Sequence, residues 1–532
     1  MRFYGNKIDI KIKYTKIKNL QRALFRKILI PTLMTQNPKL PDVESLYEQN
    51  ELLSTNARKG RIAVSTLNQW ALDFDGNRDR TLQSIYDAKA AKATYRLGPE
   101  LELSGYSCED HFYEMDTINH SLEVLAQILA TDATDGILCV VGTPLIHEGV
   151  RYNCDAYVLN RKIVGFRPKK YLADDGNYRE PRWFTSWDKD RQVEEFKLPP
   201  LLASVTGQSR VPLGDFLIET NDTILGTEKC EEMFTPRNPG IEMSLDGAEL
   251  LGNGSGSHWQ IRKLHTRVDL IRNETRKTGG VYAYSNLVGG DGGRLVFDGS
   301  AMIAQNGELV AQGKQFSLKE VDTLTAEVDF SSVQSLRASV RSLGEQADGT
   351  KPYPRLKIDF NITNNGLIPG GSASIEPFYL KPEEEIAKGP AVWLWDYLRR
   401  SGASGFFLPL SGGLDSGATA AIVGSMCAMV AEEAASGNET VIRDARRIVG
   451  EPQDSTYLPL DVKAFAHRIF YTAYMANQGM SSSETEIRAA HLAEQVGAAH
   501  LKTKGGACPK ISRFKIFRPE REWRWAICWL NS

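Results

Sequence analysis

Cysteine is scarce in this sequence, and long apolar runs and an excess of one charge are both missing. Seven cysteines in 532 residues, an odd number, exclude a disulfide framework and favour free thiols in a reducing compartment. No apolar run approaches the roughly 20 residues that cross a bilayer. The formal net charge of -2 gives no global field that would favour nucleic acid or an anionic membrane. These absences predict a cytoplasmic, multidomain globular protein with no membrane and no nucleic-acid partner.

Residues 1–60 differ in composition from the rest of the chain. From Arg2 to Lys27 there are nine Lys or Arg residues against one acid, Asp9. One interpretation is a mitochondrial targeting peptide, but such peptides favour Arg and Ser, and no Ser precedes Ser45 here. We expect residues 1–60 to be a disordered extension or a wrongly assigned start.

Apolar runs predict many strands after Gly60. They lie at 61–70, 136–145, 152–160, 223–230, 248–254, 280–286, 300–307 and 323–330. Helical spacing marks 78–93, 120–129 and 263–277. Strands with interspersed helices predict sheets covered by helices, an α/β sandwich, in a domain of residues 61–331.

A second α/β unit is expected from 376 to 501, after a linker at 332–375 that contains NITNNGLIPGGSAS. Pro382 and three following acids open a helix, which we expect to run with a break to about Ser401. FFLPL, SGGLDSG and ATAAIVGSMCAMVAEEAA then predict a strand, a Gly-rich turn and a helix.

Three residues of the first domain have the chemistry to hydrolyse an amide. Cys230 follows a strand-like run, on a strand-to-helix turn whose backbone N–H groups would stabilise a thiolate and an oxyanion. Glu100 is a candidate base for the thiol proton, and Lys169 a candidate fixed positive charge. Taken singly, a Cys is more often a small buried hydrophobe, and a Glu or Lys a solvated surface residue.

The sequence around these residues resembles the carbon–nitrogen hydrolase (nitrilase) superfamily, in the glutaminase form fused to NAD synthetases. The matching segments, in order, are LNQWALDFDGN, YRLGPELELSGYSCEDHFYE, RYNCDAYVLNRKIVGFRPK, DDGNYREPRWFTSW, CEEMFTP, LDGAELLGNGSGSH and DGSAMIAQNGELVAQGKQFSL. The resemblance implies an α-β-β-α sandwich with a catalytic triad of Glu100, Lys169 and Cys230.

The same resemblance implies roles for further residues. Glu180 would support the site, Glu231 would help to hold glutamine, and Ser257 would lie in the pocket. Glu100 would activate Cys230, and a thioester would form, release ammonia and be hydrolysed to glutamate. Lys229 replaces a residue that is usually apolar, and we expect its charge to lower the pKa of Cys230 further.

SGGLDSG has the composition of a loop that cradles phosphate, because glycines let the backbone approach and a helix N-terminus favours the anion. It is neither Gx4GK[ST] nor GxGxxG, and a purely structural turn would need no two Ser and an Asp. The segment resembles the pyrophosphate loop of the N-type ATP pyrophosphatases, in their NAD synthetase branch. That resemblance implies a Rossmann-like (adenine nucleotide alpha hydrolase-like) domain and assigns ATP, with Mg²⁺, to Ser411, Gly412, Gly413, Asp415 and Ser416.

Together the two resemblances imply that glutamine supplies ammonia to amidate deamido-NAD in an ATP-dependent reaction, in a homo-oligomer. The match ends near Leu501, so we expect an incomplete second domain followed by a tail at 502–532. The tail is interpreted either as a basic, aromatic surface segment or as sequence without an evolved role. Two alternatives therefore stay open: a stand-alone glutaminase or amidase, and an inactive subunit. No metal-ligating side chains are assigned.

Overall fold

Two β-sheets form the centre of the first domain in the computed structural model, which describes residues 58–363, 371–475 and 482–502. The predicted tail and nearly all of the basic extension lie outside these ranges. One sheet has eight strands, in the order β16 (Val321–Asp329), β1 (Lys59–Leu67), β2 (Tyr95–Leu97), β3 (Leu138–His147), β4 (Val150–Leu159), β5 (Lys162–Pro168), β7 (Arg210–Gly214) and β6 (Val193–Lys197). The other has seven, in the order β15 (Glu308–Gln312), β14 (Met302–Gln305), β11 (Val281–Asn286), β10 (Leu250–Ser255), β9 (Ile224–Glu228), β8 (Leu217–Glu219) and β17 (Arg355–Lys357).

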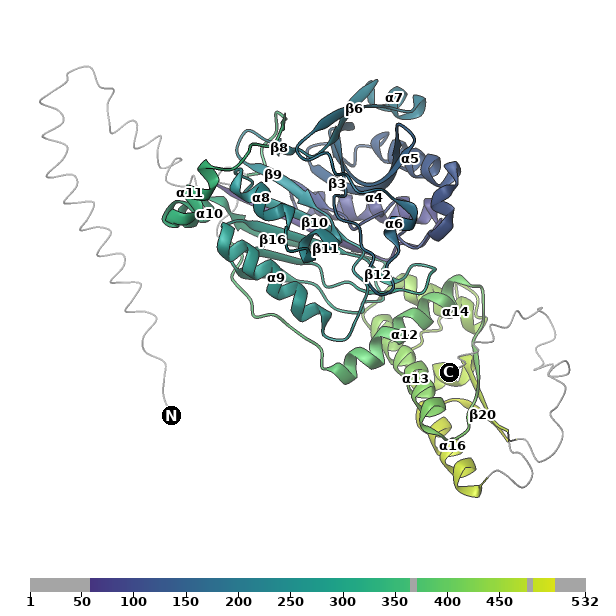
Figure 1. Cartoon of the computed structure of the whole chain (residues 1–532). Helices are drawn as coiled ribbons and strands as arrows, with labels where there is room; N and C mark the ends of the chain where they lie inside the picture. Colours follow the sequence, from purple (N-terminus) through teal and green to yellow (C-terminus); the bar gives the residue numbers. More distant parts are fainter. Residues whose placement is uncertain (1–57, 364–370, 476–481, 503–532) are drawn as a thin grey trace, which may run out of the picture. The chain divides into compact units, whose positions relative to one another are not determined.

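Side chains alternate between the two faces of each sheet. One face packs against the other sheet and the opposite face packs against helices, which gives four layers. On β11, Val281 and Ala283 face the core between the sheets, whereas Tyr282 and Tyr284 face helices α8 (Pro239–Leu245) and α9 (Lys263–Thr278). On β3, Cys139 and the other residues of its face pack against α4 (Phe74–Ala90), α5 (Met115–Leu129) and α7 (Pro200–Thr206). Figure 1 shows α4 and α5 on one side of the strands and α9 on the other. The predicted α-β-β-α sandwich is confirmed.

Part of the segment 332–375, expected to be a linker, belongs to the first domain instead, and residues 364–370 of that segment lie outside the described residues. It holds most of α10 (Phe330–Ser339), α11 (Arg341–Asp348) and β17, which pairs in parallel with β8. Leu356 and Ile358 pack against the core between the sheets. These contacts order residues 332–363, whose local sequence has no clear periodicity, because burial outweighs local propensity.

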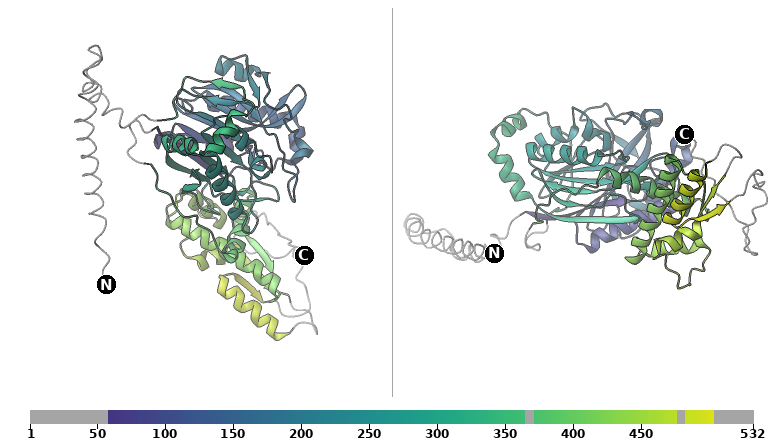
Figure 2. Two further views of the ribbon diagram at one scale, coloured as in Figure 1. Left: turned by 60° about the vertical axis from the view of Figure 1, so that its left-hand side comes forward. Right: turned by 90° about the horizontal axis from the view of Figure 1, so that it is seen from below.

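The second domain has a parallel sheet of β18 (Phe406–Pro409), β19 (Phe470–Tyr474) and β20 (Ala499–Lys502). Its helices are α12 (Pro382–Arg400), α13 (Leu414–Ala435), α14 (Glu439–Val449), α15 (Val462–Ile469) and α16 (Ser483–Val496). Figure 2 shows these helices around the strands from two further directions. Strand, helix and parallel strand in succession confirm the Rossmann-like class.

Helix α12 is continuous, although the sequence predicted a break. Pro390 lies inside it, and Val392, Trp395 and Leu398 beyond the proline are buried in the second domain's core. This burial offsets the hydrogen bond that proline removes. The helix also reaches the first domain: the Asp396 carboxylate accepts bonds from Asn68 Nδ2 at 3.1 Å and from the Gly290 backbone N–H at 2.8 Å.

Helix α13 is the one helix in the described ranges that is long and apolar enough to cross a membrane, although the sequence alone predicted none. Val423, Met426, Cys427 and Val430 on it are buried, and the helix contacts α12, α15 and α16. Packing in the core of the second domain therefore accounts for its apolar character.

We expect Leu250→Ala to lower the free energy of unfolding of the first domain by about 2–5 kcal/mol, because it opens a cavity between the two sheets. Urea unfolding followed by circular dichroism measures this change. Leu201→Ala is the control, since this leucine on α7 is 47% exposed and its loss should change the value by less than about 0.5 kcal/mol. Equal effects of the two substitutions would contradict the layered core.

Candidate active site

Glu100, Lys169 and Cys230 lie at the ends of three strands and are all buried. Glu100 is in the turn after β2, Lys169 directly follows β5, and Cys230 begins the 3₁₀ helix η2 (Cys230–Phe234) just after β9. The first two strands belong to the eight-stranded sheet and the third to the seven-stranded sheet. Stacking of the two sheets thus brings together residues that are far apart in the sequence.

Three donors fix the Glu100 carboxylate. Lys169 Nζ lies 2.7 Å from Oε1, and Asn153 Nδ2 also donates to Oε1 at 2.7 Å. The backbone N–H of Gly256 donates to Oε2 at 3.0 Å. Asn153 was not singled out in the sequence, because an asparagine within a strand-like run carries no local sign of this contact.

Lys169 is a buried ammonium group between two carboxyl groups. Its Nζ lies 2.7 Å from Glu100 and 2.8 Å from Glu180. Burial by itself lowers the pKa of Lys169, but Glu100 and Glu180 together raise it well above its ordinary value. Lys169 is therefore a permanent positive charge.

Glu180, at the start of the short helix α6 (Glu180–Trp183), has further partners. Tyr106 donates its hydroxyl proton to Oε1, and the Ala173 N–H donates to Oε2 at 3.0 Å. Burial raises the pKa of Glu180 to about 7, although Lys169 opposes the shift. The sequence had named Glu180 as a supporting residue, and the structure places its carboxyl group on the same ammonium group that binds Glu100.

Cys230 has a left-handed backbone, with φ of +42°, and its N–H donates to Asn253 Oδ1 at 3.0 Å. Burial, and then the Glu100 carboxylate, raise the pKa of its thiol; Lys169 and Lys263 act in the opposite direction. The raised pKa favours the thiol over the thiolate. Removal of water outweighs the local backbone dipoles, so the group rests as a thiol that needs a base.

Lys229 does not face the thiol in the way that the sequence suggested. Its ammonium group forms an ion pair with Asp155 of β4, and both side chains are buried. On the other side of Cys230, the Glu232 carboxylate accepts a bond from Arg167 at 2.9 Å and from the Lys229 backbone N–H at 2.7 Å.

The predicted Glu231 directly follows Cys230 in η2, and Ser257 directly follows Gly256, whose N–H donates to Glu100. Glu231 is half-buried, and burial raises its pKa. Ser257 is buried with its N–H held by Asn286 Oδ1 at 2.9 Å, and its hydroxyl has no partner among the described residues. Lys263, missed in the sequence, lies with its Nζ 3.4 Å from the hydroxyl of Tyr178. It supplies a second cation close to Cys230.

Two glycines allow the turn that carries Glu100 to pack closely. A Cβ atom on Gly142 of β3 would lie 2.5 Å from the backbone of Pro99 and of Leu101. One on Gly254 of β10 would lie 2.6 Å from the backbone oxygen of Gly98. Each sheet thus contributes a position without a side chain, and the turn lies against both.

The predicted ATP-binding residues form the loop between β18 and α13. Ser411 Oγ lies 2.9 Å from Ser416 Oγ and accepts a bond from the Gly413 N–H at 3.2 Å. Gly412 has φ of +76°, and a Cβ atom there would lie 2.2 Å from the Thr485 backbone oxygen. Asp415 is in the first turn of α13, whose N-cap Gly413 has no side chain to satisfy the helix N–H groups. The loop therefore offers free N–H donors beside hydroxyl groups.

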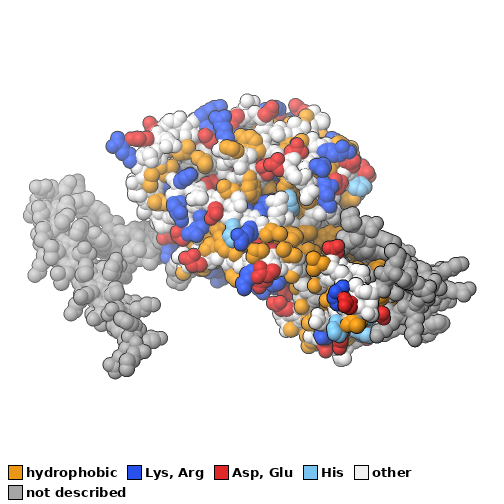
Figure 3. All heavy atoms as spheres, turned by 60° about the horizontal axis from the view of Figure 1, so that its bottom comes forward, with side chains coloured by type: hydrophobic (Ala, Val, Ile, Leu, Met, Phe, Trp, Pro, Cys, Tyr) orange, Lys and Arg blue, Asp and Glu red, His pale blue; other side chains and the backbone are white. Residues whose placement is uncertain are grey.

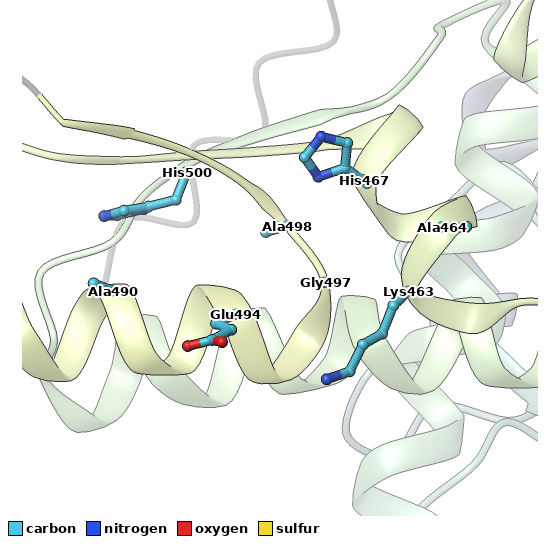
Figure 4. A pocket seen from close by; sticks show the side chains of 8 residues that line it. All are labelled: Lys463, Ala464, His467, Ala490, Glu494, Gly497, Ala498 and His500. Carbon is cyan, nitrogen blue, oxygen red and sulfur yellow. The ribbon is translucent and has the colours of Figure 1, made fainter.

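One pocket and one cluster among the described residues hold none of the predicted site residues. The pocket, of about 510 Å³, lies between α15, α16 and β20. Figure 4 shows the side chains that line it: Lys463, Ala464, His467, Ala490, Glu494, Gly497, Ala498 and His500. His147, Glu148 and Glu194 have the donor types of a metal site, but Lys189 Nζ already lies 2.5 Å from Glu194. Figure 3 shows positive and negative side chains intermixed over one face of the molecule.

The raised pKa of Cys230 predicts slow alkylation at neutral pH. We expect the rate of reaction with iodoacetamide to rise about tenfold per pH unit between about pH 6 and about pH 9, because only the thiolate reacts. Mass spectrometry of the peptide that contains Cys230 measures this rate, with Cys230→Ser as the control. A plateau already reached near pH 7 would mean that the thiolate is the resting form.

Most of the first domain matches a known enzyme family: the carbon–nitrogen hydrolases match residues 61–338, just over half of the chain. The glutamine-dependent NAD(+) synthetase of Dictyostelium discoideum is 52% identical over 440 residues, 82% of this chain and 61% of that protein. The protein of the same name from Homo sapiens is 51% identical over 445 residues, 84% of this chain and 62% of that protein. The chain spans about three fifths of the length of the curated relatives it matches.

Solved structures agree with this assignment. A glutamine-dependent NAD(+) synthetase from Cytophaga hutchinsonii superposes with a TM-score of 0.66 at 27% identity, over 84% of this chain and 65% of that one. The glutamine-dependent NAD+ synthetase from Acinetobacter baumannii, solved in complex with adenosine diphosphate, has a similar fold, with a TM-score of 0.59 at 20% identity. The sequence match, the sandwich of two sheets and the buried site between them make this chain a member of the carbon–nitrogen hydrolase family.

Proposed function

We propose that this chain hydrolyses glutamine in its first domain and uses the ammonia, with ATP, to convert deamido-NAD to NAD in its second. The observation that carries the proposal is the buried cluster of Glu100, Lys169 and Cys230, in a chain half identical to glutamine-dependent NAD(+) synthetases. Attack on a carboxamide requires a nucleophile such as a thiol, a base that takes its proton and a fixed positive charge, in a site closed to water.

In the first domain, Glu100 takes the thiol proton while Cys230 Sγ attacks the carboxamide carbon of glutamine. Lys169 stabilises the negative oxygen of the tetrahedral intermediate, because its charge is fixed and needs no reorganisation. Glu100 returns the proton to the leaving nitrogen, the C–N bond breaks and ammonia departs. Water, deprotonated by Glu100, then hydrolyses the thioester to glutamate and regenerates the thiol.

Charges beside the thiol favour an amino acid as the substrate. Lys263 is a cation, and its ammonium group is suited to the α-carboxylate of glutamine. Glu231, half-buried on η2, is suited to the α-ammonium group. Lys263 interacts electrostatically with both Cys230 and Glu231, as a group that binds the same ligand would. Ser257, with its unpartnered hydroxyl, adds one hydrogen-bonding group.

In the second domain, the loop from Ser411 to Ser416 would bind the pyrophosphate end of ATP. Its hydroxyl groups and the N-terminal N–H groups of α13 are donors for phosphate oxygens. Asp415 is exposed and carries an oxygen ligand of the kind that Mg²⁺ prefers, so the loop fits Mg²⁺ that arrives with ATP. Mg²⁺ would neutralise phosphate charge; the residues of the loop orient the nucleotide.

We expect Cys230→Ala to abolish release of glutamate from glutamine and, with it, glutamine-driven NAD formation. Added ammonium should restore NAD formation, because the second domain needs only ammonia. Purified chain with glutamine, ATP, Mg²⁺ and deamido-NAD is followed for glutamate and NAD together. Glu100→Gln should lower glutamate release by about 10²–10⁴-fold. Glutamate without NAD in the unaltered chain would restrict the function to the amidase reaction.

Asp415→Ala should have the opposite pattern. We expect loss of NAD formation from both glutamine and ammonium, because the nucleotide loop loses its carboxylate, while Cys230 still forms its thioester. Equilibrium binding of ATP and glutamate release are the two measurements. Asp454→Ala, an exposed acid outside the loop, is the control and should change neither. Unchanged ATP binding in Asp415→Ala would remove this residue from the proposed site.

A further inference from the structure

Lys229 and Asp155 form an ion pair directly beside the nucleophile, where no solvent reaches either group. The exposed fraction is 0% for the Lys229 side chain and 2% for that of Asp155. Removing two charges from water costs more than burying two apolar side chains of similar size. Burying this ion pair therefore costs free energy of folding, and the stability of the fold alone does not account for its presence.

The backbone of Cys230 requires support from its neighbours. With φ of +42°, Cys230 is in the left-handed region, which a residue with a side chain adopts only when its surroundings impose it. This conformation fixes the direction in which Sγ leaves the backbone. Whatever holds the backbone on each side of Cys230 therefore also aims the thiol.

On the side after Cys230, Glu232 provides this support. Its Oε2 accepts bonds from Arg167 at 2.9 Å and from the Lys229 N–H at 2.7 Å, and its Oε1 accepts from the Lys170 N–H at 2.5 Å. On the side before Cys230, the anchor is Lys229 itself, through Asp155.

Asp155 is in turn held in place by the core between the sheets. Its Oδ2 accepts a bond from Thr227 Oγ1 at 2.8 Å, and Tyr157 OH lies 2.9 Å from the same hydroxyl. Asp155 is on β4 of one sheet, and Thr227 and Lys229 are on or next to β9 of the other. The ion pair thus connects the residue before the nucleophile to the opposite sheet.

We propose that Lys229 and Asp155 are a positioning pair, which holds the strained backbone of Cys230 so that its thiol faces Glu100 and the substrate. The inference rests on the proposed hydrolysis of glutamine at Cys230. The pair acts through geometry and not through the charge of Lys229, because Asp155 neutralises that charge at contact distance. Loss of either partner leaves the other charge buried and unpaired, and the chain before Cys230 must then move.

The test compares Lys229→Met, Asp155→Asn, Lys229→Arg and the reversed pair, Lys229→Asp combined with Asp155→Lys. We expect each neutralising substitution to lower kcat for glutamate release at least tenfold per folded molecule, with KM within twofold and the pH profile unshifted. Lys229→Arg and the reversed pair should recover at least a third of the activity, since a positioning role needs a pair and not a particular sign at residue 229. Leu202→Ala, a core substitution on α7, controls for stability and should leave kcat per folded molecule unchanged.

A second readout does not depend on activity. Hydrogen–deuterium exchange at the amides of Cys230 to Glu232 should be at least tenfold faster in Lys229→Met and Asp155→Asn than in the unaltered chain, but not in Leu202→Ala. Equal exchange and equal kcat in all variants would overturn the inference, as would a shifted pH profile that the reversed pair fails to restore. If the unaltered chain releases no glutamate, the proposed function fails, and the exchange data alone decide whether the pair holds the backbone.

Discussion

Lys169 carries its positive charge in a place that water does not reach, between the carboxyl groups of Glu100 and Glu180. An isolated ammonium group could not remain charged there, because the cost of losing its water exceeds what dispersion and packing return. The two carboxyl groups make the charge stable, and the charge in turn orients both of them. Every other property of the site follows from this arrangement, since it fixes where the base points and how many protons the cluster holds.

With both carboxyl groups ionised, the cluster of Lys169, Glu100 and Glu180 would carry a net negative charge. The raised pKa values of Glu180 and Cys230 favour their protonated forms and so limit that charge. Glu180 has a pKa near 7, and the thiol of Cys230 keeps its proton. A resting thiol is protected from oxidation and alkylation, because only the thiolate reacts. In the proposed reaction the proton moves to Glu100 as the thiol attacks the amide carbon, so attack and deprotonation would be coupled.

The two domains contribute separate chemistry on one chain. The first domain places Glu100, Lys169 and Cys230 at strand ends between two stacked sheets, where all three are buried. The second domain instead offers an exposed loop at the end of β18, with hydroxyl groups and helix N–H groups open to a charged ligand. Helix α12 belongs to the core of the second domain, and its buried Asp396 binds Asn68 and Gly290 of the first. Local sequence gives no sign of this contact, since Asn68 and Asp396 are 328 positions apart.

The sequence by itself determined the layered α/β class and the set of residues with the chemistry for catalysis and nucleotide binding. Apolar runs such as those of β3 and β11 record strands that are buried on both faces, as strands between a sheet partner and a helix layer must be. The segments around Glu100, Lys169 and Cys230, and the SGGLDSG loop, carry their resemblance in short local runs. Only the tertiary structure decided the burial, the contacts and the pKa values of those residues. The contacts of Asn153 with Glu100, of Lys263 near the thiol, of Asp155 with Lys229 and of β17 with β8 all depend on partners that are distant in the sequence. The raised pKa of Cys230 likewise could not be read from the sequence around it, because a pKa is set by burial and by charges in space.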